Sequence, residues 1–336
     1  MIGRIRPLMH GSIGRAGDDR HPWMPHEIGE RKHTMTSTYE TSTAHRSASA
    51  GRGPLARWVK RLTAVTAAVV AFGTGLSACG ASSASKDTLT QTGGHTKVVV
   101  GVCPGPYGEM VEDVLAPLLK EHGYTLTTKL FNDYVQPNKA LDSGSIQANL
   151  FQHINYLRKF SADNHLDIVS LGQVPTLGLG VYSNKYTKLS QIPDGATVSI
   201  ASDASNLARS LGVLQRNGLI TVKGDVDDTK ATVNDIATNP KHLKLKTIDA
   251  AQLARSLANV DVSLVPGNFA WAAKLKPSAA LAVERQSAGV INVVAVRKAD
   301  AKTPFAKEVK RLLVSQEFKD KIAHSKFADF GKPTTW

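Results

Sequence analysis

The chain has 336 residues, of which 42% are hydrophobic, 21% charged and 6% aromatic. This balance excludes a polytopic membrane protein and a wholly disordered chain, and two cysteines are too few for a disulfide scaffold or a multi-cysteine zinc module. Residues 1–79 hold 11 of the 41 basic and 5 of the 28 acidic side chains behind the net charge of +13. The remaining surplus is spread along the chain, so it does not predict a nucleic-acid partner.

Residues 1–54 show neither helical nor strand periodicity and are rich in Gly, Ser, Thr, Arg and His. Such a segment cannot bury enough apolar surface to offset the entropy lost on ordering. We expect a disordered extension or a mis-assigned start, with translation beginning at Met24 or Met35. The alternative is a regulatory tail.

Residues 55–78 have the pattern of a secretory signal peptide. Arg57, Lys60 and Arg61 precede an apolar run over 62–78, which Thr, Gly and Ser residues dilute. A bilayer-spanning helix needs about 20 strongly apolar residues. This run is shorter and ends in small residues, as cleaved signals do.

The run closes with Leu76-Ser77-Ala78-Cys79-Gly80, which resembles the lipobox of bacterial lipoproteins. Cleavage before the cysteine would free the Cys79 thiol for diacylglycerol, and the Ser/Thr/Gly-rich residues 79–96 would form a flexible tether. We therefore expect lipid attachment at Cys79 and a protein on the outer face of the cytoplasmic membrane. The alternative is an uncleaved anchor with an incidental cysteine.

The folded part, from residue 97 to 336, opens with an α/β pattern. Residues 97–103 form a β-branched run typical of a buried parallel strand, and Pro and Gly residues interrupt the chain at 104–108. Apolar side chains at helical spacing follow over 109–122, and a second strand is predicted over 124–131. This is a β-α-β unit.

Strands and helices continue to alternate along the chain. We expect strands over 146–151, 168–171, 197–201, 244–248 and 260–265, and helices from Pro137 to Gly144 and over 153–165, 207–215, 250–257 and 304–324. The alternation predicts an α/β fold class with two lobes and a cleft between them. Crossings near Val181-Tyr182 and over 290–297 would divide it into lobe 1 (97–181 plus 293–336) and lobe 2 (182–292), with hinge closure around a ligand.

A candidate anion site lies at the start of the helix near residue 207. Asp203 or Ser205 can cap this helix, whose first amides carry partial positive charge. Arg209 follows one turn later, where its guanidinium could bind a carboxylate bidentately. The alternative is an Arg209 side chain that runs along the helix surface to solvent.

Aromatic side chains gather at a strand-to-helix junction, where Phe151, His153 and Tyr156 lie within six residues, with Tyr134 upstream. Such rings could surround an apolar or thioether side chain, or could simply be core. A metal site on His153 and His165 is not supported, because no Cys or carboxylate pair accompanies them.

Enzyme signatures are missing from the sequence. We find no metalloprotease, nucleophile-elbow, Walker or dinucleotide-binding motif. Cys103 is expected to be a buried small residue at the end of the first strand. We therefore expect a binding protein with no cofactor and no metal, and a secreted hydrolase is the rival from another class.

Several motifs together resemble the methionine-binding lipoprotein family (NlpA/MetQ type), the substrate-binding components of ABC importers. The resemblance runs in order over essentially all of 97–336. It rests on Val99-Val-Gly-Val-Cys-Pro-Gly-Pro106, Asn132-Asp-Tyr-Val-Gln-Pro-Asn138, Ala148-Asn-Leu-Phe-Gln-His153, Asn206-Leu-Ala-Arg-Ser210 and Trp336.

The resemblance implies an α/β, two-lobed periplasmic-binding-protein-like fold of type II. It also implies a protein that binds methionine, L- or D-, between its lobes and delivers it to an ABC permease and its ATPase. It implies that Arg209 binds the ligand carboxylate with Asn206 nearby, and that Asn292 holds the α-ammonium. The side-chain pocket would be walled by Tyr134, Phe151, His153 and Tyr156.

The sequence departs from the family pattern at two places. Pro266 stands where the family usually has an Asn that contributes to the amino-acid headgroup, and proline donates no hydrogen bond. The loop at 176–178 lacks the Tyr-Pro often found there. Another amino acid, a dipeptide or an adhesin-like role without transport are therefore the alternatives.

Overall fold

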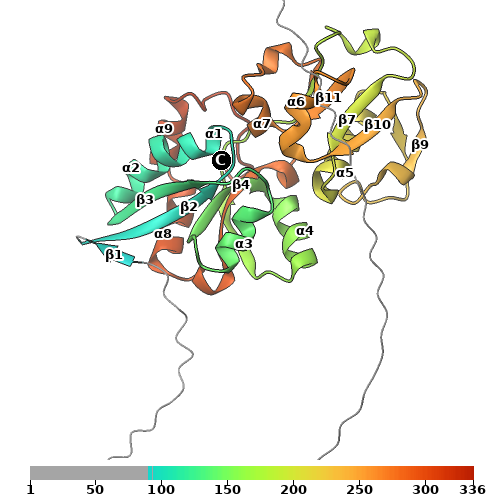
Figure 1. The fold of residues 1–336 in the computed structure, drawn as a ribbon. Coiled ribbons are helices and arrows are strands. Elements are labelled where there is room, and N and C mark those ends of the chain that lie inside the picture. The colour runs from blue at the N-terminus through green and yellow to red at the C-terminus, as the bar shows by residue number, and fades with distance from the viewer. Residues whose placement is uncertain (1–89, 93) are drawn as a thin grey trace, which may run out of the picture. The chain divides into compact units, whose positions relative to one another are not determined.

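The computed structural model describes residues 90–92 and 94–336 of the chain (Figure 1). The predicted N-terminal extension, the signal peptide and Cys79 lie outside these residues, as does most of the predicted tether. The described part forms two lobes, each built on its own sheet. Within it, no helix combines the length and the apolar character needed to cross a bilayer.

The first lobe contains a six-stranded mixed sheet in the order β1-β2-β4-β13-β5, with β3 paired to β2. β2 runs parallel to β3 and β4, whereas β13 is antiparallel to both β4 and β5. Its strands are β1 (Thr90–Thr92), β2 (His95–Val102), β3 (Tyr124–Leu130), β4 (Ala148–His153), β5 (Ile168–Gln173) and β13 (Asn292–Arg297).

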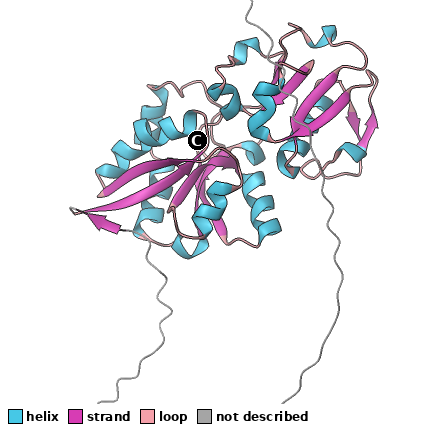
Figure 2. Cartoon of the chain, viewed as in Figure 1, coloured by secondary structure: helices cyan, strands magenta, loops and turns pink. Residues whose placement is uncertain are grey.

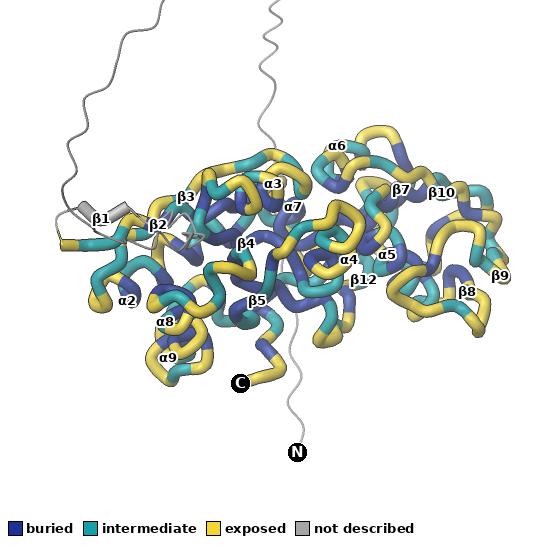
Figure 3. Tube along the Cα trace, turned by 90° about the horizontal axis from the view of Figure 1, so that it is seen from below, coloured by how far each residue is buried: buried dark blue, intermediate teal, exposed yellow. Residues whose placement is uncertain are grey.

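Helices cover both faces of this sheet (Figure 2). One face packs on α1 (Pro106–Met110), the π-helical segment Val111–Leu115, α2 (Ala116–Lys120), α8 (Pro304–Leu313) and α9 (Gln316–Ala323). The other face packs on α3 (Gln136–Asp142) and α4 (Ile154–Asn164). Every residue of β4 is buried, and the tube beside the β4 label in Figure 3 is dark blue, the colour of buried residues.

The second lobe contains a five-stranded sheet in the order β10-β7-β11-β6-β12, and β8 and β9 form a separate two-stranded antiparallel sheet. The strands are β6 (Gly180–Tyr182), β7 (Thr197–Ala201), β8 (Thr221–Val222), β9 (Ile236–Thr238), β10 (Lys244–Ile248), β11 (Val262–Val265) and β12 (Ala282–Val283). The helices are α5 (Ala204–Arg216), α6 (Leu253–Ser256) and α7 (Gly267–Ala272). The inner face of α5 buries Leu211 and Leu214 against this sheet.

The predicted strands and long helices are present, but the crossings lie elsewhere than predicted. Val181 and Tyr182 belong to β6, which pairs with β11 and β12 inside the second sheet. The first crossing therefore precedes β6, over residues 174–179. Likewise, β13 lies inside the first sheet, so the return crossing occupies 284–291 and Asn292 belongs with the first lobe.

The predicted single helix over 304–324 is two helices. α8 ends at Leu313, and the hydroxyl of Ser315 accepts a hydrogen bond from the backbone N–H of Phe318 to begin α9. A serine N-cap is a strong local start signal. The apolar periodicity continues across the break, so it hid the change of direction.

Truncating a leucine in the centre of β4 tests the assigned core. Leu150 is fully buried, whereas Leu130 at the end of β3 is 63% exposed. We expect Leu150→Ala to lower the free energy of unfolding by about 2–5 kcal/mol, because a cavity is left in packed surroundings. Leu130→Ala is the matched control and should change it by less than about 0.5 kcal/mol. Urea denaturation measures both, and equal effects would contradict the assigned strand burial.

Candidate ligand-binding site

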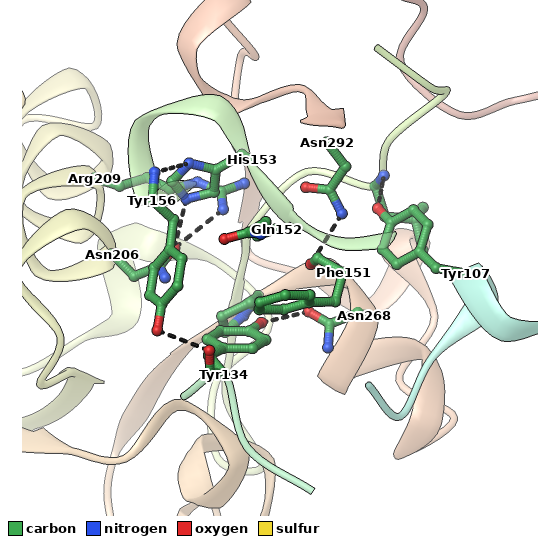
Figure 4. A pocket seen from close by; sticks show the side chains of 13 residues that line it. Tyr107, Tyr134, Phe151, Gln152, His153, Tyr156, Asn206, Arg209, Asn268 and Asn292 are labelled. Carbon is green, nitrogen blue, oxygen red and sulfur yellow. Dashed lines mark hydrogen bonds between the residues drawn. The ribbon is translucent and has the colours of Figure 1, made fainter. Parts of the chain in front are cut away.

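One pocket lies between the two lobes and contains all seven residues that the sequence nominates for ligand binding (Figure 4). The cavity left between its lining side chains has a volume of about 20 Å³, room for about one water molecule, so the lobes or the side chains must move apart to admit a larger ligand. The lining residues are Tyr107, Tyr134, Phe151, Gln152, His153, Tyr156 and Asn292 from the first lobe, Leu177 from the first crossing, and Asn206, Arg209, Pro266, Gly267 and Asn268 from the second lobe.

The start of α5 carries Arg209 into this pocket. The side chain of Asp203 caps the helix by accepting a hydrogen bond from the backbone N–H of Asn206 at 3.0 Å. Arg209 then lies on the same side of the helix as Asn206, one turn from the cap. The predicted capping is therefore confirmed, and Arg209 does not run out to solvent, because its side chain is only 7% exposed.

Glu284 neutralises Arg209 inside the protein. Arg209 Nε donates to Glu284 Oε1 at 2.9 Å and to Oε2 at 3.0 Å, and Nη2 donates to Oε2 as well. The Glu284 side chain is 2% exposed and also accepts from the backbone N–H of Leu179. Burial raises the pKa of Glu284, but the charge and hydrogen bonds of Arg209 outweigh burial and hold this pKa below its usual value.

Asn206 orients the guanidinium of Arg209 through the nitrogen that Glu284 does not contact. Arg209 Nη1 donates to Asn206 Oδ1 at 3.3 Å, while Asn206 Nδ2 donates to both oxygens of Asp203. Arg209 has five N–H donors, and Glu284 and Asn206 do not use all of them. An anionic group in the pocket can therefore bind Arg209 without breaking the ion pair with Glu284.

His153 connects the lobes and is neutral. Its Nδ1 accepts from the backbone N–H of Tyr156 at 3.1 Å, so the proton is on Nε2, which donates to Asn206 Oδ1 at 3.1 Å. Burial, followed by the charge of Arg209, lowers the pKa of His153 to about 3. Both ring nitrogens are thus used by the protein itself, which leaves no lone pair for a metal ion.

Aromatic rings form one wall of the pocket around Tyr134. Its ring centroid lies 5.7 Å from that of Phe151, 5.6 Å from Tyr156 and 5.0 Å from Phe269. The Tyr156 hydroxyl donates to the backbone carbonyl of Tyr134 at 3.0 Å. Behind these rings Cys103 is buried, as predicted, and burial raises the pKa of its thiol well above the ordinary value.

Asn292 presents an acceptor to the pocket. Its backbone N–H donates to Thr176 Oγ1 at 2.8 Å and its Nδ2 donates to the carbonyl of Phe151 at 3.2 Å. These bonds fix the orientation of the amide and leave Oδ1 without a hydrogen-bond partner among the described residues. An ammonium group is the natural partner for such an oxygen.

Sequence reasoning missed several residues of the site. Tyr107, whose hydroxyl accepts from the backbone N–H of Leu177, and Gln152 line the pocket. Gln152 was noted only as part of a family motif, and Tyr107 only as part of the break at 104–108. Glu284 is an isolated acidic residue in an extended segment, and no sequence pattern indicated its ion pair with Arg209. Asn268 lies two residues after Pro266, and neither periodicity nor spacing indicated a role for it.

The lining residues suit recognition rather than covalent chemistry. One cation balanced by a buried anion, one free amide acceptor and a wall of rings could hold a small zwitterion with an apolar side chain. None of the lining residues is a Ser, Cys or Lys, and the imidazole of His153 is held by two hydrogen bonds.

The pKa of His153 makes stability depend on pH. The imidazole of His153 binds a proton near pH 6.5 in the unfolded chain but only near pH 3 in the folded protein. The free energy of unfolding therefore falls as the pH drops from 6.5, by about 2 kcal/mol at pH 5 from this group alone. We expect His153→Gln, which titrates no proton there, to show a shallower fall between pH 6.5 and 5. Denaturant titrations at each pH measure the difference, and parallel curves would contradict a buried neutral His153.

Known proteins resemble this chain in both sequence and fold. The chain is 33% identical over 261 residues to the methionine-binding lipoprotein MetQ of Bacillus subtilis, covering 76% of this chain and 93% of that protein. A nutrient-binding protein from Burkholderia cenocepacia, solved bound to methionine, has a TM-score of 0.65 and 39% identity over 69% of this chain and 97% of its own.

A periplasmic substrate-binding protein of an ABC transporter from Coxiella burnetii gives a TM-score of 0.65 with 38% identity, over 70% of this chain and all of that one. All three names describe binding proteins, and the TM-scores show that the two solved structures share the fold of this chain. The model of the NlpA lipoprotein family matches residues 98–334. The chain therefore belongs to the NlpA lipoprotein family.

Proposed function

We propose that this protein is the lipid-anchored, extracytoplasmic substrate-binding component of an ABC amino-acid importer. It binds methionine between its lobes and delivers it to the permease, which a partner ATPase drives. The observation that carries the proposal is Arg209, buried in the interlobe pocket with Glu284 on one side and unused N–H donors on the other. Membership of the NlpA family and the names of the relatives support the same function.

The amino-acid headgroup would be divided between the two lobes. Its carboxylate would accept hydrogen bonds from Arg209, which Asn206 orients from the same helix. Its ammonium would donate to Oδ1 of Asn292 on β13. A ligand held in this way touches both lobes at once, so binding favours their closed arrangement.

The ligand side chain would lie against Tyr134, Phe151 and Tyr156. Thioether sulfur makes favourable contacts with aromatic rings, in addition to the apolar surface removed from water. His153 closes this wall as a neutral hydrogen-bonded group. Binding then involves no chemical step, and the protein is not an enzyme.

Pro266 bears on which ligand the pocket selects. It lines the pocket at the N-terminal end of α7 and offers no side-chain hydrogen bond. D-methionine, another amino acid or a methionyl dipeptide are therefore tested alongside L-methionine, with the adhesin-like role without a ligand as the remaining candidate.

Thermal unfolding of the ligand-stripped protein with each amino acid, D-methionine and methionyl dipeptides tests the function. A ligand at 100 times its Kd stabilises the folded state by about 2.7 kcal/mol, which is a rise in Tm of roughly 5–11 °C for a protein of this size. We expect this rise with methionine. A rise in Tm with another compound alone would assign that compound as the ligand. No rise with any of them would contradict amino-acid binding.

Removing the Arg209 guanidinium tests its place in the site. We expect Arg209→Ala to weaken methionine binding by about 2–5 kcal/mol, because it removes one partner of a buried charge pair. Arg216→Ala, on the exposed end of the same helix, is the control and should bind normally. Isothermal titration calorimetry measures both.

Because Arg209→Ala also leaves Glu284 buried without its partner, a second variant separates stability from binding. Arg209→Met with Glu284→Leu removes both charges, and such replacements often keep or raise stability. We expect this folded variant to bind no methionine. Binding at the wild-type Kd would remove Arg209 from the site.

Replacing each of the two cysteines is expected to affect membrane attachment differently. Cys79→Ala removes the predicted lipid-acceptor thiol, so we expect the protein to leave the membrane fraction while its methionine binding is unchanged. Cys103→Ala changes a cysteine buried behind the aromatic wall and should leave the protein in the membrane fraction. Cell fractionation with immunoblotting measures both, and retention of Cys79→Ala in the membrane would contradict lipid attachment there.

A further inference from the structure

We propose that Asn268 is a positioning residue that holds the lobes closed and fixes Tyr134 in the ligand-contacting wall, so that it sets how long a bound ligand stays. Asn268 lies in α7 of the second lobe and is buried. Both hydrogen bonds of its side-chain amide cross to the first lobe. The inference rests on the proposed function, since the residence time is that of the ligand.

The two bonds of Asn268 reach two separate loops. Its Oδ1 accepts from the Tyr134 hydroxyl at 2.6 Å, and its Nδ2 donates to the backbone carbonyl of Pro104 at 2.9 Å. Figure 4 shows the bond from Tyr134. Pro104 follows β2 and Tyr134 follows β3, so one amide ties together the ends of two strands of the opposite sheet. Burial raises the pKa of Tyr134 well above its ordinary value, which keeps this hydroxyl protonated and able to donate.

The backbone around Asn268 fits closely against the first lobe. A Cβ on Gly105 would lie 2.7 Å from both the Cβ and the carbonyl oxygen of Asn268, and Gly105 has a φ of +135°, which favours glycine. A Cβ on Gly267 would lie 2.4 Å from the Cβ of Leu177. Two glycines therefore allow the approach that brings the Asn268 amide within bonding distance of both partners.

Tyr134 links this contact to the ligand. Its ring touches Phe151, Tyr156 and Phe269, and it lines the pocket. Because Asn268 holds its hydroxyl from the opposite lobe, the wall takes its described arrangement only when the lobes are together. A ligand can leave only after both bonds of Asn268 have broken.

Binding kinetics of Asn268→Leu test this role, because leucine has a similar volume and makes no hydrogen bond. Two lost bonds predict methionine dissociation roughly 5- to 100-fold faster. The association rate constant should change less than about twofold, since encounter takes place with the lobes apart. Stopped-flow or surface plasmon resonance measurements give the two rate constants separately.

Two further variants make the test specific to the interlobe contact. Asn184→Leu removes a comparable amide-to-carbonyl bond, from Asn184 Nδ2 to Leu257, that lies wholly within the second lobe; we expect it to lower Tm without changing dissociation. Tyr134→Phe removes one of the two Asn268 bonds. Its effect on dissociation should not add to that of Asn268→Leu in the double variant, because both changes remove the same bond.

The outcomes separate this inference from the proposed function. If the wild-type protein binds methionine, dissociation from Asn268→Leu at the wild-type rate, or no faster than from Asn184→Leu, overturns the role of Asn268. If the wild-type protein binds none of the compounds, the proposed function fails. Small-angle X-ray scattering of the ligand-free proteins then tests the interlobe role of Asn268 by itself. A larger radius of gyration for Asn268→Leu than for wild type then supports the interlobe role, and equal radii overturn it.

Discussion

The buried ion pair between Arg209 and Glu284 is the interaction on which the pocket depends. Taking two charges out of water costs several kcal/mol per ion, and only close, well-oriented hydrogen bonds offset that cost. Glu284 meets this demand with three bonds to Arg209 and one from Leu179. Since Leu179 and Glu284 border the two crossings, the pair ties α5 to both connections between the lobes.

This arrangement decides what the pocket can recognise. With its charge balanced by Glu284, Arg209 offers directed N–H donors rather than an excess positive charge, which suits a ligand that is neutral overall. Asn292 supplies the complementary acceptor from the other lobe, and the rings around Tyr134 supply an apolar wall. Recognition by fixed polar groups and desolvation of a side chain is all that a delivery protein requires.

Local signals in the sequence predicted the elements and much of the site, whereas long-range pairings were missed. The Asp203 cap and the apolar face of α5 are encoded within one helix, so the helix and the place of Arg209 one turn after its cap could be predicted. These local signals left open whether the Arg209 side chain turns inward or runs to solvent, and the resemblance to the family indicated the pocket. Glu284 is 75 residues from Arg209, and Asn268 is 134 residues from Tyr134. No periodicity reports such contacts. The crossings were misplaced for a related reason, because short strands such as β6 resemble linkers until their partners in the sheet are known.

Isothermal titration calorimetry with headgroup analogues tests the central claim most directly. Methioninol keeps the side chain and the ammonium but lacks the carboxylate, and the hydroxy analogue of methionine keeps the carboxylate but lacks the ammonium. The account predicts that both bind at least tenfold more weakly than methionine, because each leaves a buried polar group, on Arg209 or on Asn292, without its partner. Methioninol binding as tightly as methionine would contradict the assignment of Arg209 to the ligand carboxylate.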